Sequence, residues 1–308
     1  MIAALLTAIL YACSAIFGQR AARLFGPLKA NALRLLIACV LLGILTWVTD
    51  ALLGRTSLIP AVYPALFWSG AVGFGLGDVG LFLAYPRLGA RLTILLNFSL
   101  GTLFAAWGDQ LMLGETLALP QWGGVGLILT GLAMALWPEG GPGARAAAPW
   151  SGLGFATLAG AGQGFGTTLS GWANQVAASH QVTIHGISQA FQRCTAGVIV
   201  AVGVWLVWRV WLKRPDQAPE PPGRKLPLKR PGFWLAGAAV FGPVAGVSCY
   251  QWARLELPSA IVVAVVATST LWVIPLAKWI EKDHPGRRQT AGTILAAAGI
   301  AVLYLVRI

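Results

Sequence analysis

The chain has 308 residues, of which 57% are hydrophobic and only 10% are charged, with a formal net charge of +12. A soluble domain of ordinary composition carries about 25% charged residues, so this composition excludes a water-soluble globular protein and indicates a membrane protein. The positive charge does not indicate nucleic-acid binding, because the basic residues fall in short segments between long apolar stretches. The four cysteines lie in apolar stretches without a CxxC pair, so we expect no disulfides, no metal site and no cofactor.

Ten apolar stretches follow one another along the chain, and each approaches the roughly 20 residues that a helix needs to cross a bilayer. They are continuously apolar and do not alternate, which favours helices over a β-barrel. No basic leader precedes the first stretch, so we interpret it as a retained helix and not as a signal peptide. The sequence therefore predicts an all-α membrane protein with ten transmembrane helices, at residues 2–18, 28–49, 62–84, 92–111, 119–137, 151–173, 184–208, 232–253, 258–280 and 289–306.

The chain contains an internal repeat, which is clearest in the last two spans of each half. An offset of 168 residues superposes Gln121 on Gln289, together with two glycines, a leucine and a turn carboxylate. These further pairs are Gly124 with Gly292, Leu127 with Leu295, Gly131 with Gly299, and Glu115 with Asp283. We therefore divide the chain into a first five-helix repeat at 1–137, a Pro/Gly-rich linker at 138–150 and a second five-helix repeat at 151–308.

The distribution of basic residues predicts how the two repeats lie in the membrane, because cytoplasmic loops are rich in lysine and arginine. Segment 19–29 has three basic residues and its counterpart 174–183 has none, whereas 50–61 has one and its counterpart 209–231 has seven. Related loops thus face opposite sides, as duplication of an odd number of spans requires, so we predict inverted repeats with both termini outside. The proline-rich segment 209–231 is then a cytoplasmic linker, either a solvated loop or one that contacts anionic lipid.

Over nearly its whole length the chain resembles the drug/metabolite transporter superfamily, and within it the EamA branch. The resemblance rests on a Leu-Gly-Glu turn before a Gln/Gly-rich last helix, and on an arginine in the second span of each half. These residues are Leu113, Gly114, Glu115, Gln121 and Gly131, with Arg34 and Arg193. The second repeat departs from the family pattern, because Asp283 stands where the family usually has Glu.

The resemblance implies secondary transport by alternating access through a cavity between the repeats. Family members move amino acids, nucleotide sugars, other small metabolites or drugs, and many exchange them for protons. A bacterial inner-membrane location and an export direction are further expectations from the family. Because a duplicated chain can build its cavity alone, we expect a functional monomer, with the lipid bilayer, a small-molecule substrate and protons as partners.

Ionisable side chains inside apolar spans are costly and usually face a cavity or a partner, so they are the first candidates for a transport pathway. Asp78 lies in a glycine-rich run of the third span, at a depth similar to that of Arg34 in the second. We therefore predict an ion pair, which either holds these spans together or takes part in proton coupling or substrate binding. Asn31, one turn before Arg34, either joins this cluster or stabilises the helix start.

A second polar face lies on the seventh span, where Gln189, Gln192 and Arg193 are spaced at i, i+3 and i+4. This face either lines the cavity, or Arg193 extends to the outer lipid headgroups instead. Further candidates either line the cavity or make interhelical contacts, and they are Asn97, Gln163, Tyr250 and Gln251. Trp68 either stacks on a cationic or planar substrate or packs against lipid and neighbouring helices.

The turn carboxylates Glu115 and Asp283 precede the last helix of each repeat. A carboxylate there is favoured by the positive end of the helix dipole, so we interpret Glu115 as a structural capping residue, with a gate or coupling role as the alternative.

Three classes of function compete for this chain. The inverted repeat and the polar faces favour a secondary transporter, an exporter of a small metabolite or drug that is coupled to protons or exchange. An enzyme is disfavoured because the three histidines lie outside any HExxH or GxSxG motif. A channel or uncoupled facilitator for small solutes is the alternative, although the sequence has no repeated filter motif or ring of charges.

Overall fold

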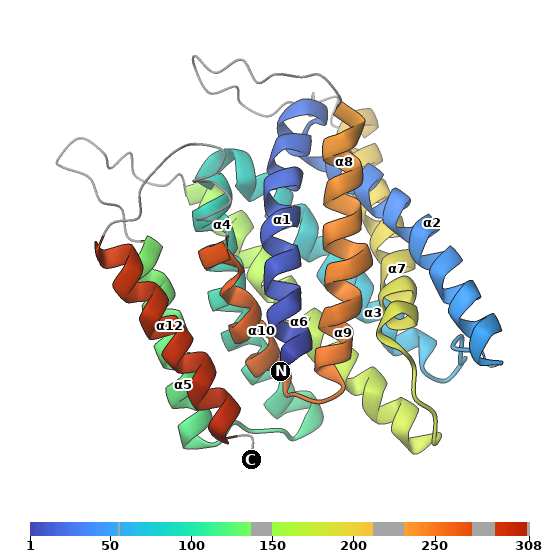
Figure 1. Ribbon diagram of the computed structural model, residues 1–308. Helices are drawn as coiled ribbons and strands as arrows, with labels where there is room; N and C mark the ends of the chain where they lie inside the picture. The colour runs from blue at the N-terminus through green and yellow to red at the C-terminus, as the bar shows by residue number, and fades with distance from the viewer. Residues whose placement is uncertain (55, 137–149, 212–230, 273–286, 307–308) are drawn as a thin grey trace.

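The computed structural model describes residues 1–54, 56–136, 150–211, 231–272 and 287–306. All regular structure in these ranges is helical, and the helices pack into one bundle (Figure 1). The first half contains α1 Ile2–Phe25, α2 Pro27–Leu53, α3 Tyr63–Gly70, the π-helix η1 Ala71–Gly77, α4 Asp78–Leu113 and α5 Leu119–Leu136. The second half contains α6 Trp150–Ser179, α7 Gly186–Leu206, the π-helix η2 Val207–Trp211, α8 Pro231–Ala239, the π-helix η3 Val240–Gly246, α9 Val247–Arg254, α10 Ser259–Ala267 and α12 Arg287–Val306.

Each of the ten predicted spans corresponds to a helix, which confirms the all-α fold, although some helices consist of consecutive elements. The third span joins α3, η1 and the start of α4, and the rest of α4 forms the fourth span. The eighth span joins α8, η3 and α9 in the same way. Within the described residues, six helices are long and apolar enough to cross a membrane, while α5, α10 and α12 contain shorter apolar stretches.

Two predicted boundaries are wrong. The predicted loop at 85–91 is helical, and two helical segments meet directly at Gly89, which has φ 76° and ψ 165°. Glycine adopts positive φ without a Cβ penalty, so the chain bends there without a longer loop. The first helix ends at Phe25, well beyond the predicted residue 18, because a helix can continue past the apolar stretch that crosses the membrane. Most of the two predicted linkers, at 138–149 and 212–230, and the end of the ninth predicted span lie outside the described residues.

The two halves cross the bundle in opposite directions. In Figure 1, α1 begins at the lower end of the bundle, where both termini lie, whereas α6 begins at the upper end. This arrangement confirms two inverted five-helix repeats. We call the end with both termini the terminus side, and the opposite end, where α1 meets α2 at Gly26, the loop side.

The third helix of each repeat contains a π-helical segment at an equivalent place. Segments η1 and η3 are both seven residues long, and an offset of 169 residues superposes Ala71–Gly77 on Val240–Gly246. Glycines in both segments, and Pro243 in η3, weaken the regular α-helical hydrogen bonding. Segments of π-helix occur frequently at functional sites, because the wider turn redirects the side chains that follow. Here the residue that follows η1 is Asp78.

Glycines let α6, at the centre of the bundle, approach both η1 and α4 closely. A Cβ at Gly162 on α6 would lie 2.4 Å from Cα of Gly77, and one at Gly164 would lie 2.6 Å from the carbonyl oxygen of Gly101. Without a hydrophobic force between helices in lipid, such close backbone packing is a main source of helix association. The glycine-rich helix α6 therefore packs closely against both η1 and α4 at the centre of the bundle.

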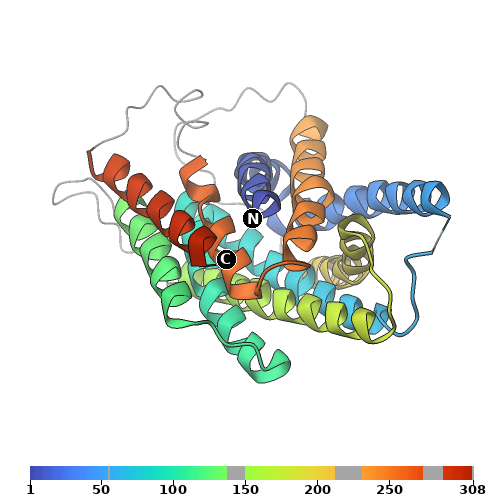
Figure 2. The same ribbon diagram turned by 60° about the horizontal axis from the view of Figure 1, so that its bottom comes forward.

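The repeated glycines of the sequence bring α5 and α12 together at one edge of the bundle. Figures 1 and 2 show these two helices side by side. A Cβ at Gly131 would lie 2.6 Å from the carbonyl oxygen of Gly292, and one at Gly299 would lie 2.7 Å from that of Gly124. The last helices of the two repeats therefore pair with each other through the residues that the duplication preserves.

Candidate functional site

A cavity lies between the two repeats, in the loop-side half of the bundle. It offers about 60 Å³ to the centres of water-sized molecules, and one water needs roughly 10–15 Å³ by this measure. Its wall includes Tyr11 and Gln163 near the middle of the bundle, and Gly18 and Tyr85 nearer the loop side. The cavity therefore has room for several waters or for part of a small solute.

Arg34 and Asp78 form a charge pair in the wall of this cavity. Nη2 of Arg34 donates to Oδ2 of Asp78, and also to Oδ1 of Asn31 at 3.0 Å. The guanidinium carbon lies 4.8 Å from the ring centre of Phe82, and this cation–π contact further stabilises the buried charge of Arg34. The predicted ion pair is thus present, and of the two alternatives for Asn31 the structure shows the one in which it joins this cluster.

Asp78 is the more accessible partner of the pair. Its side chain is 16% exposed against 7% for Arg34. A carboxylate next to a cavity can accept a proton or a substrate cation, and either event would compete with Arg34 for the same oxygen. The arrangement can therefore couple binding in the cavity to the contact between α2 and α4.

The arginines of the two repeats each pack against the π-helix of the other repeat. A Cβ at Gly242 in η3 would lie 3.3 Å from Nη1 of Arg34, and a Cβ at Gly73 in η1 would lie 2.9 Å from Nη2 of Arg193. Gly73 and Gly242 are themselves related by the offset of 169 residues that superposes η1 on η3. The guanidinium of Arg193 also lies 5.0 Å from the ring centre of Phe74, which lines the cavity.

The polar face of α7 points into the bundle and not to lipid headgroups. Arg193 is buried, and its Nη1 donates to Oε1 of Gln251 at 2.8 Å. The amide of Gln251 donates in turn to Oε1 of Gln189 at 2.9 Å and to Ser170 Oγ at 3.1 Å. The alternative in which Arg193 reaches the outer headgroups is wrong, because these partners on α6 and α9 hold it inside.

Gln192 belongs to the same face but has different partners. Its Nε2 donates to the carbonyl oxygen of Ser57 at 2.9 Å, which ties α7 to the loop after α2. None of the three polar residues of α7 lines the cavity itself. They lie on its terminus side.

Of the further candidates, Asn97 and Gln163 lie in the cavity wall, and Tyr250 lies next to the cavity on its terminus side. Nε2 of Gln163 donates to the hydroxyl of Tyr250 at 3.0 Å, and the ring of Tyr250 stacks on Tyr11 at a centroid distance of 6.3 Å. Tyr11 also stacks on Phe98 at 6.0 Å, so an aromatic layer closes the cavity toward the terminus side.

The structure excludes Trp68 from the site. Its side chain is 59% exposed on the outside of the bundle and does not line the cavity. Close backbone packing of the third helix against α6 turns the opposite face of that helix inward, with Ser69 donating to the carbonyl oxygen of Gly166. Trp68 instead packs edge-on against Phe67 at a centroid distance of 6.2 Å.

The sequence led us to expect that Glu115 caps the last helix of its repeat, but in the structure it does not. It precedes α5 by four residues, and the helix start is held by Gln121, whose Oε1 accepts from the amide of Ala118 at 2.9 Å. The Glu115 carboxylate instead lies 3.7 Å from Nη2 of Arg254 in the other repeat. Its counterpart Asp283 lies outside the described residues.

Asp109 is a buried carboxylate that sequence reasoning missed. It lies near the terminus-side end of α4, is 3% exposed, and accepts hydrogen bonds from Thr168 and from the backbone amide of Ser259. The signal was present, because Asp109 lies inside the predicted span 92–111, where the rule that singled out Asp78 applies equally. Within the described part of the chain, no group of three or more His, Cys, Asp or Glu side chains could hold a metal ion.

Known proteins agree with this architecture. One solved structure, described only as "Crystal structure of protein", superposes with a TM-score of 0.70 at 16% sequence identity, covering 99% of this chain and 96% of the other. This likeness concerns the fold alone. No curated protein matches the sequence.

A family model gives the stronger result. The model of the EamA-like transporter family matches residues 1–137 and 150–305, which correspond to the two five-helix repeats. The family consists of membrane transporters of small solutes, which agrees with the apolar spans and the cavity between the repeats. The chain therefore belongs to the EamA-like transporter family and is a multi-pass integral membrane protein.

Proposed function

We propose that the protein is a secondary active transporter that moves a small polar metabolite, such as an amino acid, or a drug across the membrane by alternating access. The Arg34–Asp78 pair in the wall of a cavity between two inverted repeats carries this proposal. Charged groups within apolar spans are costly and characteristically mark substrate or ion pathways. Transport is export, coupled to protons or to exchange.

Asp78 is the coupling residue in this mechanism, and Arg34 is its partner. When Asp78 binds a proton or a cationic group of the substrate, its attraction to Arg34 falls and α2 becomes free to move relative to α4. Asn97 and Gln163 supply neutral hydrogen-bonding groups in the same cavity wall. Arg193, Gln189 and Gln192 lie on the terminus side of the cavity and meet the substrate after the pathway has opened there.

The loop side of the bundle faces the cytoplasm of a bacterium, with the protein in the inner membrane as a functional monomer. The described basic residues at this end include Arg20, Lys29, Arg87 and Arg209, whereas Arg254 at the terminus side is held inside the protein by an ion pair. A reporter enzyme that works only in the cytoplasm should therefore be inactive when it is fused after Ile308. Activity of that fusion would reverse the orientation.

Counterflow in proteoliposomes tests the carrier mechanism. Candidate substrates come first from a thermal-shift screen of the purified protein with amino acids, nucleotide sugars, organic cations and sugar phosphates at two pH values, because a ligand of the folded state stabilises it. The identified ligand, loaded inside the vesicles, should then accelerate uptake of its labelled form, and uptake should saturate. Uptake that neither saturates nor responds to internal ligand would support the channel or facilitator instead.

A further inference from the structure

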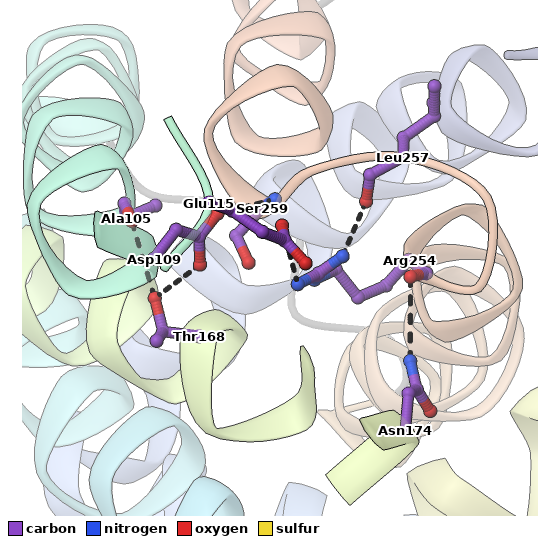
Figure 3. Close-up of polar contacts among 8 residues, drawn as sticks. All are labelled: Ala105, Asp109, Glu115, Thr168, Asn174, Arg254, Leu257 and Ser259. Atoms are coloured by element: carbon purple, nitrogen blue, oxygen red, sulfur yellow. Dashed lines mark hydrogen bonds and ion pairs between the residues drawn. The ribbon is translucent and has the colours of Figure 1, made fainter. Parts of the chain in front are cut away.

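The terminus side of the bundle is closed by polar contacts that join the two repeats, and the first of these centres on Asp109. One carboxylate oxygen, Oδ1, accepts from Thr168 Oγ1 on α6 at 2.9 Å, and the other, Oδ2, accepts from the amide of Ser259 at the start of α10 at 2.9 Å (Figure 3). Asp109 belongs to the first repeat and both partners belong to the second. A single buried carboxylate therefore ties α4 to two helices of the other repeat.

The second contact joins Glu115, in the loop between α4 and α5, to Arg254 at the end of α9. The carboxylate lies 3.7 Å from Nη2 of Arg254, while Nη1 donates to the carbonyl oxygen of Leu257 at 2.7 Å (Figure 3). The backbone carbonyl of Arg254 accepts from Nδ2 of Asn174 on α6 at 3.4 Å. Arg254 is buried whereas the Glu115 side chain is 38% exposed, so solvent is excluded from this ion pair on the arginine side only.

The cavity lies on the other side of these contacts. Three sets of contacts lie between the cavity and the terminus side. They are the aromatic layer of Tyr11 and Tyr250, the network around Gln251, and the contacts of Asp109 and Arg254. The contacts of Asp109 and Arg254 thus join the two repeats between the cavity and the terminus side. A solute in the cavity can leave in that direction only if the two repeats separate there.

A purely structural helix cap would be expected to come from a residue close in sequence, as Gln121 does for α5. Asp109 instead binds the first amide of α10 from 150 residues away, across the boundary between the repeats. Among the described residues no ion pair of Asp109 is found, so its buried charge depends on these hydrogen bonds and on the positive end of α10. The burial of Asp109 is therefore linked to the packing of the two repeats against each other.

We propose that Asp109 with its partners Thr168 and Ser259, together with the Glu115–Arg254 pair, forms the terminus-side gate of the transport pathway. These contacts hold the gate closed while the cavity is reached from the loop side, and they separate when the substrate passes to the terminus side. The proposal rests on the proposed transport function. It adds to that function the residues that determine which side is open.

Thiol labelling of a buried reporter cysteine tests the gate. The reporter is Ser170→Cys, in a background where the four native cysteines are replaced, because Ser170 is fully buried on α6 at the level of the gate. The full-length protein, reconstituted in nanodiscs without substrate, is treated with a charged, membrane-impermeant maleimide. We compare the labelling rates of Asp109→Ala and Glu115→Arg with that of the reporter protein alone.

Both variants should label faster by at least about tenfold, because losing one hydrogen bond or ion pair to a buried charge shifts the open–closed equilibrium by that order. The charge swap Glu115→Arg with Arg254→Glu should return the rate to that of the reporter protein. Ser179→Ala is the matched control, since Ser179 also lies near the terminus side, at the end of α6, but its hydroxyl donates to the carbonyl oxygen of Val176 in the same helix. This control should not change the rate.

Unchanged labelling in both gate variants would overturn the proposal. Equal acceleration in Asp109→Ala and Ser179→Ala would also overturn it, because general loosening of the fold would then be the cause. If Asp109→Ala does not fold, the swap series decides alone, and failure of the double variant to restore slow labelling counts against the gate. Because labelling is measured without substrate, a negative counterflow result would contradict the proposed function and leave this readout intact.

Discussion

Arg34 and Arg193 lie in the second helix of each repeat, yet within the described part of the chain only Arg34 meets a carboxylate. Each arginine packs against a glycine of the opposite π-helix, so the backbone is symmetric around them. The residue after η1 is Asp78, whereas the residue after η3 is Val247, and Arg193 is left to an uncharged partner, Gln251. The two repeats thus place their arginines in similar backbone surroundings, but Asp78 in one repeat and Val247 in the other make these surroundings chemically different.

Replacing Asp78 with asparagine should abolish proton-driven transport and leave exchange intact. The amide keeps an oxygen that can accept from Arg34, but it cannot bind or release a proton. Uptake driven by a pH gradient and counterflow, both measured in proteoliposomes, separate the two activities. Glu220→Gln, in the linker predicted from the sequence, removes a carboxylate outside all predicted spans and should change neither; full proton-driven activity of Asp78→Asn would exclude the coupling role.

Replacing Arg193 with glutamine should lower transport by at least about tenfold, because losing a hydrogen bond to a charged group costs roughly 1.5–3 kcal/mol. Glutamine still offers an amide donor to Gln251, so the melting temperature in detergent should stay close to that of the wild type. Arg209→Gln on the exposed surface at the end of the same helix is the matched control. Normal transport by Arg193→Gln would mean that the arginine only supports the fold.

Trp68 and Phe74 offer a comparison of two aromatic residues on one continuous helix. Because Trp68 is exposed outside the bundle, Trp68→Ala should leave the KM for counterflow within about twofold of the wild type, as is usual for surface substitutions. Phe74→Ala should raise KM, because Phe74 lines the cavity and packs against Arg193. A large increase for Trp68→Ala alone would argue against the cavity described here.

Gly162 should be far less tolerant of a methyl group than Gly154 on the same helix. A Cβ at Gly162 would lie 2.4 Å from Cα of Gly77, whereas nothing lies within 4 Å of one at Gly154. Overpacking typically costs about 1–3 kcal/mol, while alanine in place of an exposed helical glycine gains roughly 0.5–1 kcal/mol. Thermal unfolding in detergent should therefore show a lower melting temperature for Gly162→Ala than for Gly154→Ala, and the reverse order would contradict the close packing of α6 against η1.

The candidate site could be predicted in part. The pairing of Arg34 with Asp78 followed from their similar depth in neighbouring spans, since two opposite charges in an apolar region are strongly favoured to meet. The position of Trp68 could not be predicted, because lipid tails and a protein core are equally apolar, and hydropathy does not distinguish the faces of a membrane helix. The gate contact of Asp109 was hidden for another reason, since its partner Ser259 is 150 residues away.

By itself, the sequence determined that the chain lies in a membrane, that it contains ten helices, and that its halves are inverted copies. These properties follow from the composition, the length of the apolar stretches and the repeat, all of which can be read directly from the sequence. Only the tertiary structure decided which face of each helix turns inward, where the cavity lies and which end is closed. Those features depend on how glycines such as Gly77 and Gly162 let backbones from different repeats approach, and this packing joins segments that are far apart in sequence.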